Sequence, residues 1–204
     1  MTADLSGLIV DHYERHARAW DADRRQNAWN DKPWHERFVA ALPRRATVLD
    51  LGCGGGAPVA LHLANCGLRI TGIDTSPSLI TLCRERMPDQ EWIVADMRSL
   101  SLGRRFDGIL AWDSFFHLTP RHQRRMFDVF AEHGAPGAIV MFNAGPSRGE
   151  VVGSYRGDPL YHASLAPEEY EAALRGVGFE IVAHVAKDRD AGGRTAWIAR
   201  SVRR

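Results

Sequence analysis

Short apolar runs alternate with amphipathic stretches along most of the chain. The runs are rich in valine, isoleucine and leucine, and the stretches that follow several of them carry apolar residues three and four positions apart. This change of period predicts buried strands joined by helices, which is typical of a parallel α/β sheet. Two further runs joined by a polar turn end the chain. The seven predicted strands are residues 47–51, 68–74, 92–95, 106–112, 138–142, 179–186 and 194–202.

A glycine turn follows the first predicted strand. Residues 52–56 contain four glycines, so the chain can turn sharply there and a ligand can lie directly against the backbone. Asp50 lies just before the turn, Asp74 ends the second strand and Asp96 follows the third. The carboxyl ends of parallel strands meet at one edge of the sheet, where an acid can bind a ribose. This edge is therefore the predicted ligand site.

Four segments resemble motifs of one enzyme family. Residues 48–56, Val-Leu-Asp-Leu-Gly-Cys-Gly-Gly-Gly, resemble the glycine motif of class I S-adenosylmethionine-dependent methyltransferases, and residues 72–76 resemble their second motif. Residues 96–97 and 106–112 are similar to the third and fourth motifs. The resemblance covers about residues 35–201. It implies a Rossmann-like α/β fold with a mostly parallel seven-stranded sheet, helices on both faces and a C-terminal antiparallel hairpin.

The resemblance also implies a cofactor, S-adenosyl-L-methionine, and residues for its adenosine end. Asp74 would bind the two ribose hydroxyls, and its negative charge fits a free diol better than a 2′-phosphate. Thr75 and Met97 would flank the adenine. Asp96 would accept a hydrogen bond from the exocyclic amine of the adenine.

The methionine end of the cofactor would lie at the glycine turn. By the same resemblance, Gly52 and Gly54 would face the methionine portion, and Asp50 would support their loop. The backbone near Trp112 and Asp113 would hold the methionine ammonium.

We expect one methyltransferase domain, residues 1–204, made of three parts. Residues 1–42 form an N-terminal helical lid in which Tyr13 resembles the family's lid tyrosine, and residues 43–142 form the cofactor-binding core. Residues 143–204 form a substrate-side connection followed by a C-terminal helix and hairpin. Within this part, residues 143–165 form a long glycine-rich connection without obvious secondary structure, and such connections are usually functional or disordered.

Two histidines are the candidate catalytic residues. His117 follows the fourth strand closely, and His162 lies in the glycine-rich connection. Either imidazole can accept a proton near neutral pH, which matters only if the acceptor must lose one during methyl transfer. Phe115 and Phe116 indicate an apolar wall nearby, with one of the two in the core.

Composition limits the partners of the chain. The 204 residues are 45% apolar and 25% charged, which fits one globular domain. The formal charge is +1, from 26 basic and 25 acidic side chains, and gives no electrostatic reason to expect nucleic acid or a membrane surface as a partner. We therefore expect a small-molecule acceptor, methylated at O, N or S, and a monomer or homodimer.

Localisation and metal content follow from simple patterns. No apolar run is long enough to cross a membrane, the first residues lack an export signal, and the three cysteines lie far apart, so we expect a reducing, cytoplasmic location. His12 and His16 are spaced to share one side of a helix, but no third ligand is nearby in the sequence. We interpret this pair as a solvated helix face and expect no metal.

Three alternatives stay open. A nicotinamide-dependent oxidoreductase shares the glycine turn, although its motif would need glycine where Ala57 stands, and it would leave Asp96 unexplained. A non-catalytic S-adenosylmethionine-binding module would be favoured if His117 and His162 were both remote from the sulfonium. A protein or RNA acceptor would be favoured by a basic face that only the folded chain could reveal.

Overall fold

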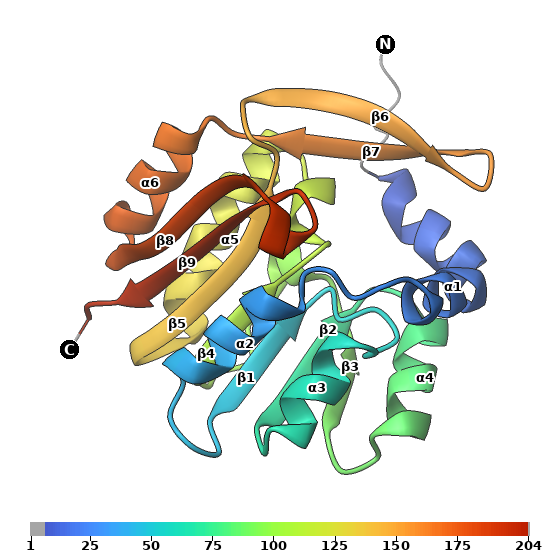
Figure 1. Ribbon diagram of the computed structural model, residues 1–204, viewed down its shortest axis with the longest axis horizontal. Helices are drawn as coiled ribbons and strands as arrows, with labels where there is room; N and C mark the ends of the chain where they lie inside the picture. Colours follow the sequence, from blue (N-terminus) through green and yellow to red (C-terminus); the bar gives the residue numbers. More distant parts are fainter. Residues whose placement is uncertain (1–6, 204) are drawn as a thin grey trace.

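The computed structural model describes residues 7–203 and contains the predicted seven-stranded sheet (Figure 1). The strand order is β3-β2-β1-β4-β5-β9-β8. The pairs from β3 to β5 are parallel, whereas β9 runs antiparallel to β5 and to β8. The predicted fold class and its terminal hairpin are therefore confirmed. The sheet strands are β1 (Thr47–Leu51), β2 (Arg69–Asp74), β3 (Glu91–Val94), β4 (Phe106–Ala111), β5 (Gly134–Ala144), β8 (Phe179–Asp188) and β9 (Arg194–Ser201).

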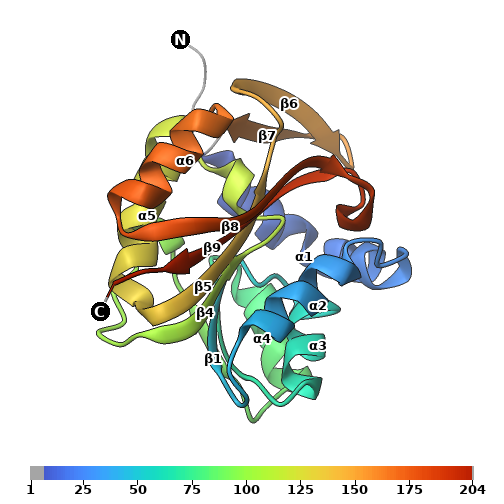
Figure 2. The same ribbon diagram turned by 60° about the vertical axis from the view of Figure 1, so that its left-hand side comes forward.

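Helices cover both faces of the sheet (Figure 2). On one face, aromatic side chains of α5 and α6 pack against the strands, and on the other α2, α3 and α4 bury Trp34, Leu63 and Ile80. Burial of these side chains is the main source of stability for such a three-layer domain. The helices are α1 (Leu8–Gln26), α2 (Lys32–Ala41), α3 (Val59–Asn65), α4 (Pro77–Arg86), α5 (Pro120–His133) and α6 (Pro167–Gly176).

Local capping chemistry sets where two of these helices begin. The Ser76 hydroxyl accepts a hydrogen bond from the Leu79 N–H at 3.1 Å, and the Thr119 hydroxyl accepts one from the His122 N–H at 3.3 Å. Each cap precedes a proline, whose fixed φ suits the first helical position. These caps place the amino ends of α4 and α5 at the same edge of the sheet as the glycine turn.

The prediction of an irregular connection at residues 143–165 is wrong. This segment ends β5 and then forms an antiparallel hairpin of β6 (Gly149–Tyr155) and β7 (Asp158–Ser164), which lies above the edge of the main sheet in Figure 1. Arg156 and Gly157 make the turn with φ of 51° and 89°. A two-residue hairpin turn favours positive φ at both positions, because its twist then matches that of the strands. Glycines and polar residues in β6 and β7 hide the alternation of apolar and polar residues that would have identified the two strands in the sequence.

Helix α1 bridges this hairpin and the main domain. Its Glu14 accepts hydrogen bonds from the hydroxyls of Ser76 at 2.5 Å and Ser78 at 2.6 Å, and its Asp21 pairs with Arg86 of α4. On the other side, Asp23 accepts a hydrogen bond from Tyr155 of β6 at 2.6 Å. Helix α1 therefore roofs the carboxyl edge of the sheet, as a lid segment is expected to. Of the helices described, none combines the length and apolarity needed to cross a bilayer.

Candidate active site

The glycine turn connects β1 to α3 and is shaped by close approach. Gly52 has φ of 76°, and a Cβ added there would lie 2.3 Å from the Cβ of Ser114, so only glycine fits without rearrangement. The Gly54 N–H donates to one carboxylate oxygen of Asp74 at 2.9 Å, and the Ser76 N–H donates to the other at 2.9 Å. Asp74 therefore orients both the glycine turn and the start of α4.

A cavity lies beneath α1 at this edge of the sheet. It adjoins a second pocket around the glycine turn, and the two share Trp20, Gly52, Gly54 and Asp113. All ten residues predicted to bind the cofactor line one or both of these spaces, although their individual roles stay predictions. Tyr13, Gly52, Gly54, Asp74, Thr75, Asp96, Met97 and Asp113 line the first, and Asp50 and Trp112 line the second.

A buried acid, Asp50, and a partly buried one, Asp74, make the floor of this site favourable for a cation. Burial and the nearby charge of Asp74 raise the pKa of Asp50 to about 7. Burial also raises the pKa of Asp74, although three backbone N–H donors oppose the shift. A positively charged ligand group placed beside these carboxylates would favour their ionised forms. The methionine ammonium of the expected cofactor has the required charge.

Asp113, at the carboxyl end of β4, is held by the densest polar network of the site. Its carboxylate accepts two hydrogen bonds from Arg194, at 2.6 and 2.7 Å, and lies 3.1 Å from a guanidinium nitrogen of Arg24. Asn143 donates to the same carboxylate at 2.7 Å. Burial would raise the pKa of Asp113, but these cations lower it below its ordinary value. The network fixes a residue with φ of 52°, a left-handed conformation that costs energy outside glycine.

Comparison with known proteins agrees with this geometry. The family profile described as methyltransferase domain matches residues 48–137, which span the glycine turn, Asp74, Asp96 and Asp113. A dTDP-3-amino-3,6-dideoxy-alpha-D-glucopyranose N,N-dimethyltransferase of Streptomyces fradiae is 31% identical over 146 residues, or 68% of this chain. The chain belongs to the class I S-adenosylmethionine-dependent methyltransferases. S-adenosyl-L-methionine, the cofactor expected from the sequence, is the cofactor of this family.

Other methyltransferases extend the comparison over the rest of the chain. A trans-aconitate 2-methyltransferase of Azoarcus sp. (strain BH72) is 26% identical over 201 residues, covering 87% of this chain and 74% of the relative. A 1,6-didemethyltoxoflavin-N1-methyltransferase of Burkholderia thailandensis, solved with S-adenosylhomocysteine, has the same fold, with a TM-score of 0.77, 18% identity, and coverage of 100% of this chain and 91% of that one. The chain spans about half, 54%, of the Streptomyces relative.

Tyr13 and His117 form a hydrogen-bonded pair between α1 and the segment after β4. The His117 Nδ1 lies 2.8 Å from the Tyr161 carbonyl oxygen, which can only accept, so Nδ1 carries the proton. The Tyr13 hydroxyl therefore donates to Nε2, at 2.7 Å. Burial lowers the pKa of His117 to about 4 and raises that of Tyr13. Both groups are neutral at pH 7, and both nitrogens of His117 are engaged.

A second, open cavity of about 670 Å³ lies beneath the β6–β7 hairpin. It shares Tyr13, Trp20, Asp113 and His117 with the cofactor cavity, so the two spaces meet at these side chains. His162 lines only the second cavity, with its ring 4.9 Å from that of His117, and burial lowers its pKa. The structure thus brings the two predicted histidines together.

The two phenylalanines separate as expected. Phe115 is fully buried in the core beside α5, whereas Phe116 lines the second cavity and contacts His162 edge-on at 5.0 Å.

Sequence reasoning missed the arginines of this site. Arg24 and Arg194 come from opposite ends of the chain, and nothing in their local sequence indicates that they flank Asp113. Arg98 was also missed. Its Nε donates hydrogen bonds to both carboxylate oxygens of Asp96, at 3.0 and 2.8 Å, and the residue lines the first cavity. Its position two residues after Asp96, next to a motif residue, was the available signal.

Proposed function

We propose that this chain transfers a methyl group from S-adenosyl-L-methionine to an O, N or S atom of a small molecule. The observation that carries the proposal is the contact between the cofactor cavity and the second cavity at Tyr13, Trp20, Asp113 and His117. A methyl donor in the first space and an acceptor in the second would meet there, beneath α1. The relatives support a small acceptor, since their names specify an amino sugar, trans-aconitate and a toxoflavin precursor.

The residues at this edge fit the cofactor chemically. S-adenosyl-L-methionine supplies a methyl group already activated by its sulfonium, so the protein must chiefly align the acceptor and exclude water. Asp74 offers two carboxylate oxygens for a ribose diol. Asp50 and Asp74 together favour a ligand with positive charge, as their raised pKa values indicate. The walls contributed by Ile9, Val10 and Leu79 keep the site apolar elsewhere.

We assign proton acceptance, where the acceptor needs it, to His162. His117 has both nitrogens engaged, by Tyr13 and by the Tyr161 carbonyl, and would instead hold Tyr13 and the hairpin in place. His162 faces the acceptor cavity, and burial lowers its pKa so that the imidazole is neutral at pH 7. A neutral imidazole can take a proton from a hydroxyl, thiol or ammonium.

The first test is calorimetric titration with S-adenosylhomocysteine, with NAD and NADP as parallel controls. We expect micromolar binding of S-adenosylhomocysteine and none of the nicotinamide cofactors. Preference for a nicotinamide cofactor would overturn the proposal in favour of an oxidoreductase. Binding without turnover of any amine, phenol, thiol or acid in a product-release screen would favour a non-catalytic binding module.

The same titration repeated across pH tests the role of Asp50. Its pKa of about 7 means that the carboxyl is partly protonated in the free protein at neutral pH. Because an ammonium prefers the ionised carboxylate, affinity should rise as pH increases from about 6 to about 8, and the Asp50→Asn variant should lose most of this dependence. An unchanged slope in the variant would exclude Asp50.

Replacing His162 with alanine should lower kcat by about 100-fold and leave cofactor affinity nearly unchanged, if the acceptor must lose a proton. The readout is the rate of S-adenosylhomocysteine release with saturating acceptor, compared with calorimetric affinity for the product. His162→Gln is the matched control for shape, and it should be equally slow. A large fall in Tm with normal turnover of the folded fraction would instead assign His162 a structural role.

The cellular location and assembly also remain proposals. We retain the prediction of a cytoplasmic monomer or homodimer that does not act on nucleic acid, on the grounds of the near-neutral charge and widely spaced cysteines.

A further inference from the structure

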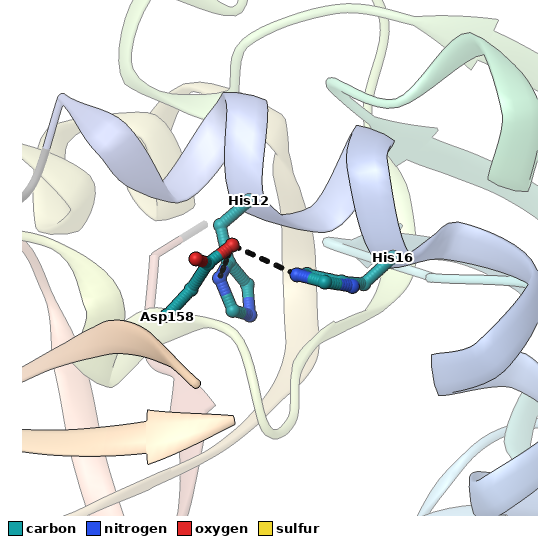
Figure 3. Close-up of side chains that lie close together, drawn as sticks. All are labelled: His12, His16 and Asp158. Carbon is teal, nitrogen blue, oxygen red and sulfur yellow. Dashed lines mark hydrogen bonds and ion pairs between the residues drawn. The ribbon is translucent and has the colours of Figure 1, made fainter. Parts of the chain in front are cut away.

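Helix α1 and the β6–β7 hairpin meet at a cluster of two histidines and an aspartate (Figure 3). His12 and His16 lie one turn apart on α1, and Asp158 begins β7. The Asp158 Oδ2 lies 2.8 Å from the His16 Nε2 and 3.9 Å from the His12 Nδ1. One ligand atom from each residue falls within 4.8 Å of the other two. From the sequence, we interpret His12 and His16 as part of a solvated helix face with no third ligand nearby. The fold instead buries His12 and brings Asp158 beside both histidines.

His12 is the feature that hydrogen bonding within the protein leaves unexplained. The residue is only 3% exposed, and neither of its ring nitrogens has a hydrogen-bond partner among the described residues. Leaving a buried polar atom unpaired costs roughly 1–3 kcal/mol. Figure 3 shows the ring of His12 directed toward Asp158 and beside that of His16. An ion coordinated by Nδ1 would satisfy this atom.

We propose that His12, His16 and Asp158 bind a divalent transition-metal ion of the zinc type. Two imidazoles and one carboxylate are ligands that zinc accepts, and water can complete a four-coordinate site. Zinc bonds of about 2.1 Å would place tetrahedral ligand atoms roughly 3.4 Å apart. The two distances to Asp158 Oδ2, 2.8 and 3.9 Å, lie on either side of that separation. Side-chain rotations that move the ligand atoms by roughly 1 Å would bring these two distances, and the separation of the two histidine nitrogens of at most 4.8 Å, to that value.

The surroundings of the cluster provide space for an ion, and they also contain a positively charged side chain that competes with it for Asp158. A cavity of about 320 Å³ adjoins the cluster and is lined by Leu8, Asp11, His12, Arg15, Asp158 and Pro159. It gives water and metal access to the buried imidazole. The guanidinium of Arg15 donates to the same Asp158 oxygen at 2.7 Å, and it is well exposed. Arg15 can therefore swing into solvent when a cation takes its place.

The position of the site determines its role. Its three ligands join α1, which roofs the cofactor cavity through Tyr13 and Trp20, to the hairpin that covers the second cavity. A metal there would fasten the lid onto the hairpin beside the reaction site, without contacting the space where methyl transfer is proposed. Its binding is therefore separable from catalysis and from the identity of the acceptor.

The test is calorimetric titration of chelator-treated full-length protein with zinc, with a competing chelator for calibration. We expect one equivalent to bind and to raise the Tm, because a ligand that binds only the folded state stabilises it. His12→Gln and Asp158→Asn should each weaken zinc binding roughly tenfold or more, since each removes a ligand and keeps the side-chain volume. Magnesium, which prefers oxygen ligands, should not bind there.

Two further variants separate this site from adventitious binding. His62 and Cys66 form another exposed pair, with 3.8 Å between Nε2 and Sγ, and Cys66→Ser should leave the main zinc affinity unchanged. Arg15→Ala should strengthen zinc binding by removing the competing cation, an effect that a purely structural Arg15–Asp158 ion pair does not predict. Equal zinc affinity in wild type, His12→Gln and Asp158→Asn would overturn the proposal, as would weaker binding in Arg15→Ala.

Discussion

Replacing Asp74 with alanine should weaken S-adenosylhomocysteine binding by roughly 100-fold, or about 3 kcal/mol. The carboxylate is expected to accept hydrogen bonds from both ribose hydroxyls, and bonds to a charged acceptor are stronger than neutral ones. It also accepts hydrogen bonds from the Gly54 and Ser76 N–H groups at 2.9 Å each, so its loss frees the glycine turn that is expected to face the methionine. Calorimetry of the purified variant measures the effect.

The same substitution should leave the fold nearly as stable. Burial raises the pKa of Asp74, which means that the fold disfavours its ionised form and gains little from it without a ligand. Glu91→Gln is a suitable control, because Glu91 begins the neighbouring strand β3, away from the cavity, and pairs with Arg104. Asp74→Asn should lie between wild type and alanine. If Asp74→Ala binds as wild type does, Asp74 takes no part in the site.

Replacing Asp113 with alanine should lower the free energy of unfolding by about 3 kcal/mol, or roughly 10 °C in Tm for a domain of this size. The substitution leaves the Arg194 guanidinium without the two hydrogen bonds it makes at 2.6 and 2.7 Å and removes one partner of Arg24. Arg194 would keep only Asp31, at 4.0 Å, as a counterion, and a half-buried cation with so distant a partner is costly. Thermal and denaturant unfolding followed by circular dichroism measure the loss.

Two comparisons between variants test whether loss of the charge pair causes the fall in stability of Asp113→Ala. In the double variant Asp113→Ala/Arg194→Ala the loss should be less than the sum of the single losses, because the unpaired cation is gone. The cations hold the pKa of Asp113 below its ordinary value, so its contribution is present above about pH 4 and is lost as pH falls through the lowered pKa. The gap in stability between wild type and Asp113→Asn should therefore narrow in acid. Additive losses and a constant gap would contradict the charge-pair explanation.

Local sequence patterns predicted most strands and helices of the fold and the acidic residues of the site. The strands that end before Gly52 and at Asp74 were predictable from their apolar, β-branched runs. One run is followed by a glycine turn and the other by a helix N-cap and proline, and few structures other than a strand fit such a pattern. The acids at the strand ends came from the same argument, since parallel topology brings carboxyl ends together. Family resemblance then gave these residues expected roles. The helix and hairpin that end the chain were found from period and turn residues alone.

What the sequence did not reveal depends on contacts between distant segments. Arg24 and Arg194 meet Asp113 only after α1 has packed over the sheet edge and β9 has paired with β5, the neighbour of β4. A single arginine in a sequence gives no sign of its partner. The third member of the histidine cluster, Asp158, likewise lies on a hairpin that was not predicted. That hairpin escaped notice because Val151 and Val152 point largely into solvent, at 64% and 50% exposed, so its alternation does not follow burial.

Helix α1 contributes none of its described residues to the two main hydrophobic clusters, although it roofs the cofactor cavity. It is held largely by polar contacts, from Glu14 to the start of α4 and from Asp21 to Arg86. The free energy with which α1 docks over the cavity therefore depends on contacts other than those that stabilise the folded sheet. We therefore expect α1 to open as a sub-global unit, which would admit the expected cofactor while the sheet edge beneath it keeps its shape.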